Sequence, residues 1–260
     1  MTADTNYLDV TELVGEPITA TQLGRLYHRY KWAAERSVGA DVVECGCGTG
    51  PGLGLLASRA RSFAAGDFSP FMVEAARRHY GSRFPISQFD AQELPFAAQS
   101  KDVILLFEAI YYIPDAARFI AECARVLRAD GRILIVTVNK DQVDFHPSAH
   151  SVRYYGVVEL RELLAAHGFK ASFSAIEPVA EVGLRQGLLR PIKRLAVMSG
   201  LMPKTMAGKR WLKRIVFGPQ QPMPAELTEG MAEYQPPSPI PGEVADRAHR
   251  IVYCEATRSA

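Results

Sequence analysis

Between Asp41 and Glu177, short apolar runs alternate with segments in which apolar residues recur at helical spacing. The apolar runs are typical of strands buried in a parallel sheet. They predict strands at residues 41–45, 62–67, 86–91, 101–108, 131–138 and 169–177, and a seventh strand at 249–257. The segments between them predict helices at residues 51–60, 69–80, 115–127 and 157–168. Because strands alternate with helices, we expect right-handed crossovers and an α/β fold with a doubly wound, mostly parallel sheet.

Residues 178–248 interrupt this alternation. Within them, residues 182–225 contain no Asp or Glu but nine Lys and Arg residues. Two amphipathic helices are expected there, at residues 190–200 and 205–218. The chain is therefore expected to have three parts. They are an N-terminal helical cover (1–40), a core (41–177 plus 249–258) and a cationic insertion or lid (178–248) between the last two strands.

A cluster of glycines follows the first expected strand, in the sequence VVECGCGTGPGLGLLA at residues 42–57. Glycines allow positive φ angles and a close approach of the backbone to a ligand. Two cofactor classes use such a loop at the carboxyl end of a strand, where open α/β sheets bind ligands. A dinucleotide site requires G-x-G-x-x-G, and Pro51 stands where the third glycine is needed. The spacing here is E-x-G-x-G-x-G instead, from Glu44 to Gly50.

Two aspartates end the next two expected strands. Asp67 can accept hydrogen bonds from both hydroxyls of a ribose, which either cofactor class would offer. Asp90 can accept a hydrogen bond from the exocyclic amine of an adenine, with the backbone of Ala91 beside it. Together, the glycine loop and these two aspartates favour an adenosine whose other end carries no phosphate. A nicotinamide-dependent oxidoreductase is the alternative within the same fold.

These residues lie in four blocks that resemble the class I S-adenosylmethionine-dependent methyltransferases. The blocks are VVECGCGTGPGL (42–53), GDFSPFMVEAARR (66–78), FDAQELPFAAQSKDVILLFEAIYYIPD (89–115) and FIAECARVLRADGRILIV (119–136). The resemblance covers about residues 40–177 and the final strand, and the cationic insertion departs from it. It implies a Rossmann-like, doubly wound, seven-stranded sheet of order 3-2-1-4-5-7-6 with the last strand antiparallel. It also implies S-adenosyl-L-methionine as the cofactor and S-adenosyl-L-homocysteine as the product.

The resemblance assigns a role to each part of the cofactor site. In that family the glycine loop wraps the methionine part, the acid after the second strand binds the ribose, and the acid after the third strand binds the adenine amine. An aromatic helix before the first strand closes over the methionine carboxylate, a role for RLYHRYKWA (25–33) to which packing on the sheet is the alternative. The cofactor-binding residues implied are Tyr27, Tyr30, Glu44, Gly46, Cys47, Gly48, Gly50, Asp67, Phe68, Asp90, Ala91, Phe107 and Glu108.

The methyl acceptor is expected above the ends of the fourth and fifth strands, beside the segments FEAIYYIP (107–114) and NKDQVDFHPSAHSVRYYG (139–156). A hydroxyl acceptor benefits from a general base, and His suits this role near neutral pH. His150 is favoured slightly over His146, because Pro147 is expected to direct His146 into loop packing. As alternatives, the tyrosines pack a helix entry and the histidines lie at the surface. The expected catalytic residues are His150, His146, Glu108 and Tyr112, and the expected substrate-binding residues are Tyr111, Tyr112, Arg153 and Tyr154.

The net charge and the cysteines limit which ligands and partners the sequence predicts. The formal net charge of +2 is too small to indicate nucleic-acid binding, and no RNA-binding motif accompanies the basic run. Cys45 and Cys47 supply two ligands where zinc needs four, so no metal site is expected. The first twenty residues hold four acids and no Lys or Arg, unlike the basic start of a signal peptide. We therefore expect a cytoplasmic protein.

The basic run has three interpretations. It is a solvated face over a small satellite core, a site for an anionic acceptor such as a sugar nucleotide or phosphorylated intermediate, or a peripheral membrane contact through residues 184–217. Taken together, the sequence predicts S-adenosylmethionine-dependent methyl transfer to a small molecule or saccharide, with oxygen preferred over nitrogen. The alternatives are a nicotinamide-dependent oxidoreductase and a binding module that keeps the cofactor pocket without turnover.

Overall fold

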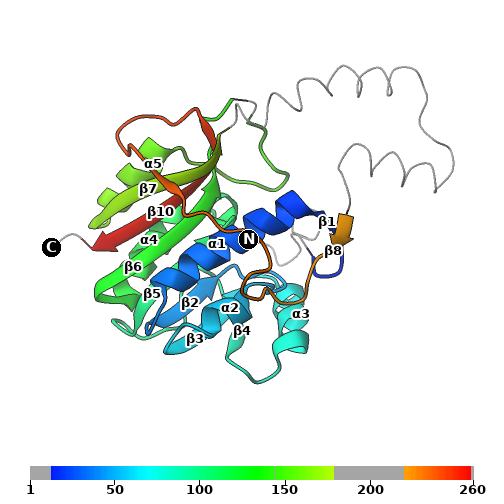
Figure 1. The fold of residues 1–260 in the computed structure, drawn as a ribbon. Helices are drawn as coiled ribbons and strands as arrows, with labels where there is room; N and C mark the ends of the chain where they lie inside the picture. Colours follow the sequence, from blue (N-terminus) through cyan, green and yellow to red (C-terminus); the bar gives the residue numbers. More distant parts are fainter. Residues whose placement is uncertain (1–12, 144, 179–219, 259–260) are drawn as a thin grey trace, which may run out of the picture.

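The computed structural model describes residues 13–143, 145–178 and 220–258 (Figure 1). Its main sheet has eight strands: β2 (Asp41–Cys45), β3 (Ser62–Asp67), β4 (Ile86–Gln88), β5 (Lys101–Phe107), β6 (Leu127–Val138), β7 (Phe169–Pro178), β9 (Ser238–Ile240) and β10 (His249–Arg258). Their order is β4-β3-β2-β5-β6-β10-β7-β9. The pairs from β4 to β6 are parallel, whereas β10 runs antiparallel to both β6 and β7. The sheet is therefore mostly parallel, and β10 begins at the edge where the parallel strands end.

The seven expected strands lie in the expected order, but the expected count is short by one. The additional strand, β9, pairs antiparallel with β7 at the edge of the sheet, with Ile240 opposite Phe173. It lies in the proline-rich sequence PPSPIP (236–241). Such a sequence does not predict a strand, because sheets tolerate proline mainly in edge strands. Strand β4 ends at Gln88 rather than 91. It ends there because Asp90 accepts a hydrogen bond from the backbone N–H of Gln92 (2.8 Å) and turns the chain.

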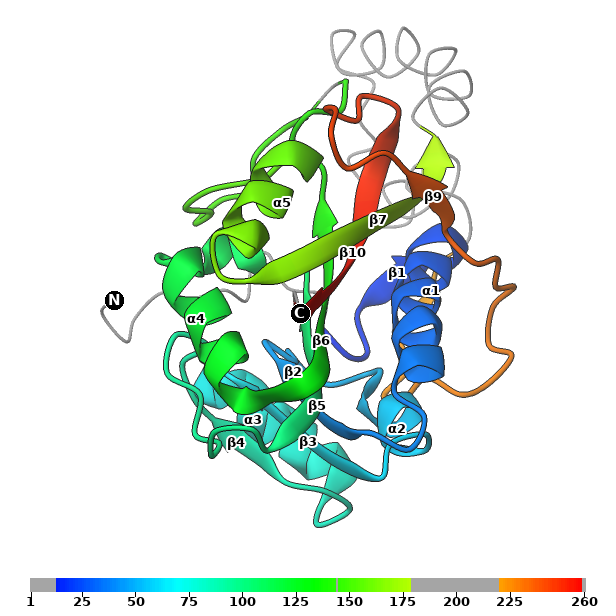
Figure 2. The same ribbon diagram turned by 90° about the vertical axis from the view of Figure 1, so that its left-hand side faces the viewer.

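Helices cover both faces of the main sheet. They are α1 (Ala20–Arg36), α2 (Leu53–Ala57), α3 (Pro70–Tyr80), α4 (Ala116–Val126) and α5 (Val157–Ala165), with a 3₁₀ turn η2 (Ile110–Tyr112) after β5. Figure 2 shows α4 and α5 on one side of the sheet and α1 and α2 on the other. Local signals set their starts: Thr19 and Gln22 form a capping box at α1, and Asp115 accepts from Arg118 N at α4 (3.0 Å). Among the described residues, none of these helices has the length and apolar character that crossing a membrane requires.

A second, two-stranded sheet and a following segment hold α1 against α2. Strands β1 (Pro17–Thr19) and β8 (Gln220–Pro222) pair antiparallel. Beyond β8, Leu227 N donates to the carbonyl of Pro51 (2.6 Å) and Gly230 N donates to the hydroxyl of Tyr27 (2.8 Å). The end of the expected insertion thus packs on the expected N-terminal cover. The two expected insertion helices, the nine basic residues and the 184–217 membrane contact all lie outside the described residues.

Candidate active site

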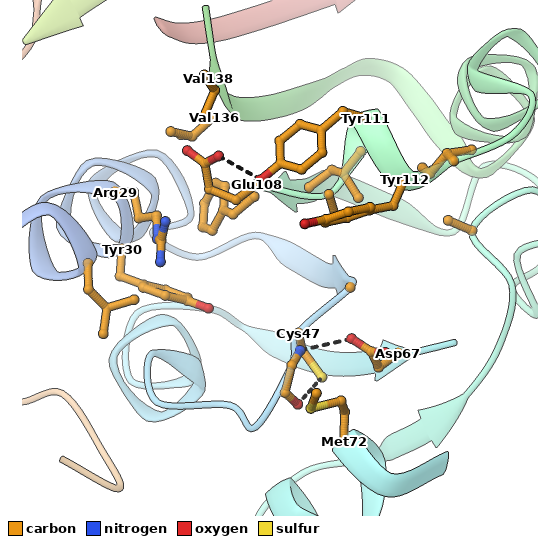
Figure 3. Close-up of a pocket in the computed structure, with 18 of the residues that line it drawn as sticks. Arg29, Tyr30, Cys47, Asp67, Met72, Glu108, Tyr111, Tyr112, Val136 and Val138 are labelled. Atoms are coloured by element: carbon orange, nitrogen blue, oxygen red, sulfur yellow. Dashed lines mark hydrogen bonds between the residues drawn. The ribbon is translucent and has the colours of Figure 1, made fainter. Parts of the chain in front are cut away.

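A pocket of about 570 Å³ opens at the carboxyl edge of the sheet, beneath one face of α1. Its wall comes from the glycine loop after β2, the ends of β3, β5 and β6, and the start of β10. Figure 3 shows Tyr30 of α1, Asp67 at the end of β3 and Glu108 after β5 around this cavity. Open α/β sheets bind ligands at this edge. The pocket is therefore the candidate active site.

The glycine loop is locked to the end of β3 by Asp67. Gly46, Gly48 and Gly50 have φ angles of 70°, 56° and 81°, which side chains rarely tolerate. The Asp67 carboxylate accepts hydrogen bonds from Gly48 N and Ser69 N, both at 2.9 Å. Burial raises the pKa of Asp67, while these two N–H donors oppose the rise. Each carboxylate oxygen of Asp67 thus already accepts one hydrogen bond and keeps the capacity to accept another.

Asp90 is oriented by Gln92, a pocket residue that the sequence analysis missed. The side-chain amide of Gln92 donates to both oxygens of Asp90 at 3.1 Å. Phe89 and Ala91 flank Asp90 and also line the pocket. A Cβ atom at Gly66 would lie 2.1 Å from the ring of Phe89, so a glycine is required in β3 for this ring to pack. In the sequence, Gln92 could have been identified by its position two residues after Asp90.

Tyr30 and Glu44 form a buried pair under the glycine loop. The Tyr30 hydroxyl donates to Oε1 of Glu44 (2.7 Å), and Glu44 is fully buried. Burial raises the pKa of Glu44 to about 8, against the lowering effect of the Tyr30 hydrogen bond. Among the described residues, Oε2 of Glu44 has no hydrogen-bond partner. Tyr30 lines the pocket, and Glu44, which does not, lies behind it and is joined to it by this hydrogen bond.

Helix α1 contributes a different set of residues from the one expected. Tyr27 does not line the pocket, because its hydroxyl accepts from Gly230 N. Gln22, Arg25 and Arg29 do line it, and Figure 3 shows Arg29 extending from α1 beside Tyr30. Their spacing of three and four residues places them on one helix face. The spacing of Gln22, Arg25 and Arg29 in the sequence is the signal that could have identified this polar face.

Glu108 and Tyr111 form a second polar pair, on the far side of the pocket from the glycine loop. The Tyr111 hydroxyl donates to Oε2 of Glu108 (3.1 Å; Figure 3), and Glu108 N donates to the Val136 carbonyl (2.8 Å). Glu108 has a φ angle of 49°, a strained value for a residue with a side chain. Burial, followed by the nearby Glu108 charge, raises the pKa of Tyr111. Tyr111 therefore stays protonated and holds the carboxylate of Glu108 in place.

The loop after β6 brings His146 to the pocket and keeps His150 away from it. His146 lines the pocket, whereas His150 occupies an exposed turn with a φ angle of 64°. The structure therefore places His146 rather than His150 at the pocket, and His146 is exposed instead of packed within the loop. Arg153 and Tyr154, expected at the substrate, do not line the pocket either.

The positions of Arg153 and Tyr154 have clear physical reasons. The ring of Tyr154 stacks on Tyr111 at 4.3 Å, and its hydroxyl accepts from Ser148 N (3.0 Å). Arg153 lies over the ring of Tyr155 at 5.1 Å and pairs with Glu159 at 3.6 Å. Tyr154 thus supports Tyr111 from behind, and Arg153 belongs to a surface cluster.

Most expected site residues share the one pocket. Those that line it are Tyr30, Gly46, Cys47, Gly48, Asp67, Phe68, Asp90, Ala91, Phe107, Glu108, Tyr111, Tyr112 and His146. Those that do not are Tyr27, Glu44, Gly50, His150, Arg153 and Tyr154. Burial raises the pKa of Cys47, so this thiol stays neutral within the loop. The sequence analysis also missed Met223 and the three residues of β10, Arg250, Ile251 and Tyr253.

The polar atoms around the glycine loop fit an adenosine-linked amino acid. Thr49 Oγ1 and Glu44 Oε2 are buried and have no hydrogen-bond partner among the described residues. Thr49 lines the pocket, so a bound group with hydroxyl or ammonium donors would supply a partner for its hydroxyl, and a carboxylate on that group would suit the guanidinium groups of α1 that line the same pocket. The donor set therefore suits a nucleoside carrying an amino-acid chain.

Comparisons with known proteins agree with this geometry. Residues 43–135 match the methyltransferase domain family. A protein of Mycobacterium tuberculosis (strain ATCC 25618 / H37Rv), described as "Probable S-adenosylmethionine-dependent methyltransferase", is 37% identical over 149 residues. That match covers 54% of this chain and 52% of the relative. The chain thus spans about half the length of the first curated relatives it matches.

Two further similarities extend the comparison. An O-methyltransferase of Penicillium expansum is 30% identical over 184 residues, covering 64% of this chain and 62% of that protein. Among solved structures, the YcgJ protein of Bacillus subtilis superposes with a TM-score of 0.56 at 16% identity, covering 90% of this chain and 99% of that one. At this identity the structural likeness shows the fold alone.

Proposed function

We propose that this chain, whose residues 43–135 match the methyltransferase domain family, transfers a methyl group from S-adenosylmethionine to an oxygen atom of a small-molecule or saccharide acceptor. The observation that carries this proposal is that one pocket contains both the adenosine-type carboxylates, Asp67 and Asp90, and a separate carboxylate, Glu108. The first two lie on the cofactor side, and Glu108 lies where the chemistry would occur.

The residues for the cofactor follow from the fit described above. Asp67 would accept from the ribose, Asp90 from the adenine amine, and the loop from Gly46 to Gly50 would follow the methionine chain. Arg29, beside Tyr30, would bind the methionine carboxylate, because a guanidinium pairs well with a carboxylate. The bound cofactor supplies an activated methyl group on a sulfonium ion. Relatives described as S-adenosylmethionine-dependent methyltransferases support this assignment.

Glu108 is proposed as the general base for an acceptor hydroxyl. Tyr111 donates to one of its oxygens, and the strained backbone at Glu108 is of the kind stored at functional sites. The carboxylate would take the hydroxyl proton as the acceptor oxygen forms its bond to the methyl group. A neutral amine needs no such base, so a held carboxylate favours transfer to oxygen. The Penicillium expansum relative, described as an O-methyltransferase, supports this preference.

Two other residues would complete the acceptor side. His146 lines the pocket at its exposed rim and could relay the proton to solvent. Tyr112 also lines the pocket, with its hydroxyl 2.9 Å from Ser148 Oγ. Burial raises the pKa of Tyr112 although the Ser148 contact opposes the rise, so Tyr112 acts as a neutral hydrogen-bonding wall. Tyr112 would position the acceptor, and His146 would pass to solvent the proton that Glu108 accepts.

The test is transfer of a labelled methyl group to pools of hydroxyl-bearing and amine-bearing small compounds. Wild type should label hydroxyl compounds, and Glu108→Gln should lower kcat roughly a hundredfold with little change in S-adenosylhomocysteine affinity. Glu93→Gln is the matched control, since the Glu93 side chain is 83% exposed. Labelling confined to amines, with full activity in Glu108→Gln, would contradict the proposal.

A further inference from the structure

Arg250 is a pocket residue that the proposed cofactor roles leave unused. It stands near the start of β10, which enters the carboxyl edge of the sheet because it runs antiparallel to its neighbours. Its carbonyl accepts from Asn139 N (2.9 Å), so the backbone is fixed beside the end of β6. Arg250 lines the pocket, and its Nε atom is buried with no hydrogen-bond partner among the described residues.

The acids nearest to Arg250 along the chain are already engaged. The Asp246 carboxylate accepts from the N–H groups of Ala248 and His249 (2.7 and 3.2 Å) and lies 2.8 Å from Nδ1 of His249. Glu255 pairs with Arg36 (2.9 Å) and Arg132 (2.7 Å). Asp246 and Glu255 thus already have other partners, and no ion pair of Arg250 is found among the described residues.

The surroundings of Arg250 make this arrangement costly without a ligand. Its neighbour Ile251 pairs with Val138 of β6 and Ile176 of β7, and all three apolar residues line the same pocket. A guanidinium whose Nε is removed from water among apolar groups loses free energy unless a partner restores its hydrogen bonds. An anionic group entering from the pocket would do so, since the planar guanidinium binds phosphate and carboxylate through paired hydrogen bonds.

The wall that carries Arg250 is not the wall proposed for the cofactor. Arg29 reaches the pocket from α1 beside Tyr30, which packs on the glycine loop through its close approach to Gly52. Arg250 reaches it from β10, next to the end of β6 and the acceptor-side loop that carries His146. Arg25 and Arg29 already supply two guanidinium groups on the α1 side for the single carboxylate of the cofactor, so a further one on the β10 wall indicates a second anion.

We propose that Arg250 binds an anionic group of the methyl acceptor, a phosphate or a carboxylate, so that the substrate is an anionic hydroxyl compound. This rests on the proposed function, because it places the acceptor on the β10 wall of the same pocket. Arg25, which also lines the pocket from α1, adds positive charge to the path by which such a substrate enters. A neutral acceptor of the same shape would leave Arg250 without its counter-charge and would bind more weakly.

The test uses inorganic phosphate and acetate as probes for the two anions, at fixed ionic strength, with the full chain saturated with S-adenosylhomocysteine. Phosphate binding is followed by ³¹P line broadening, and acetate binding by saturation transfer to its methyl protons. Arg250→Ala should weaken binding of the preferred anion roughly tenfold, and Arg250→Lys should weaken it less. Arg247→Ala, on the same segment, is exposed and outside the pocket, and it should match wild type.

The affinities for phosphate and acetate, and their change in Arg250→Ala, identify the anion that Arg250 binds. Tighter binding of phosphate than acetate assigns a phosphorylated acceptor, and the reverse assigns a carboxylate. Equal anion affinity in wild type and Arg250→Ala, or no saturable binding to wild type, overturns the inference. Loss of S-adenosylhomocysteine affinity in Arg250→Ala with unchanged anion binding also overturns it, because Arg250 would then hold the cofactor. If wild type binds no S-adenosylhomocysteine, the proposed function fails. The anions are then titrated into the unliganded protein, where equal affinity in wild type and Arg250→Ala again overturns the anion site.

Discussion

The polar side chains at the two edges of the main sheet differ in whether they have partners. At the amino edge, Arg61 binds Asp41 (2.6 Å) and Asp102 (2.9 Å), and Arg128 binds the same two carboxylates at 3.0 and 2.6 Å. At the carboxyl edge, Glu44 Oε2, Thr49 Oγ1 and Arg250 Nε are buried and unpartnered among the described residues. Native proteins rarely leave buried polar atoms unsatisfied. Thr49 and Arg250 also line the pocket, where a bound ligand would supply hydrogen-bond partners.

The carboxylates at the two edges also differ in acidity. Hydrogen bonds, first from Arg61 and then from Ser62, hold the pKa of Asp41 well below its usual range. Burial instead raises the pKa of Glu44 to about 8. The amino edge thus contributes stability through charge pairing, whereas the carboxyl edge gives up stability by burying a carboxylate that supports the pocket.

The largest expected effect is on the pH dependence of the unfolding free energy, to which Glu44 and Asp41 should contribute in opposite directions. The Glu44 pKa is about 8 in the folded protein and near 4.5 when unfolded, so the folded state holds its proton more tightly. The stability that this proton provides is complete below about pH 4.5 and is lost as pH rises toward about 8. Relative to Glu44→Gln, wild type should lose on the order of 4 kcal/mol of unfolding free energy across this range, measured by urea denaturation.

Asp41→Asn provides the matched comparison for that pH series. The Asp41 pKa is lowered, so its contribution is present above the unfolded pKa and is lost only as pH falls below it. The gap between wild type and Asp41→Asn should therefore stay constant from about pH 5 to about pH 8. A constant gap for Glu44→Gln as well would show that Glu44 is not buried as described.

The next effect in size concerns Asp67, which joins the glycine loop to the end of β3. Asp67→Ala should lower S-adenosylhomocysteine affinity at least about tenfold, because each hydrogen bond to a charged acceptor contributes about 1.5–3 kcal/mol. Asp67→Asn, which keeps one acceptor oxygen, should lie between this variant and wild type. Asp41→Ala, at the other edge, should bind like wild type in the same calorimetric titration. Unchanged affinity in Asp67→Ala would remove Asp67 from the cofactor site.

The smallest effect is expected at the amino edge. Asp102 accepts from Asp41 N (2.7 Å) and from both arginines, so Asp102→Ala leaves a half-buried N–H unpaired. The unfolding free energy should fall by about 1–2 kcal/mol, with no change in S-adenosylhomocysteine affinity. Glu93→Ala, at an exposed carboxylate, controls for loss of charge alone. A large loss of ligand affinity in Asp102→Ala would show that the two edges are not independent.

The same contrast explains what the sequence could predict. Strands β2 and β3 and their terminal residues, from Gly46 to Asp67, were found because local patterns fix them: apolar runs, glycines with positive φ angles and an acid at a strand end. Arg250 was missed because its place in the pocket depends on the antiparallel entry of β10, a tertiary event. His146 and His150 could not be ranked, because four residues of loop backbone decide which one faces the cavity.

Some predicted site residues lie next to the pocket without lining it. Glu44 was expected at the cofactor, and it is hydrogen-bonded to Tyr30 behind the pocket wall. Tyr154 was expected at the substrate, and its ring stacks on Tyr111. In both cases the aromatic partner lines the pocket and the predicted residue holds it. Sequence spacing identifies such pairs but cannot tell which member faces the ligand.

The measurement that tests the central claim most directly is a calorimetric titration of the full chain with S-adenosylhomocysteine, with NADH and NADPH titrated alongside. We expect saturable, one-to-one binding of S-adenosylhomocysteine and no binding of either nicotinamide cofactor. Binding of NADH or NADPH without S-adenosylhomocysteine would contradict it, and the glycine loop, Asp67 and Asp90 would then belong to a dinucleotide site.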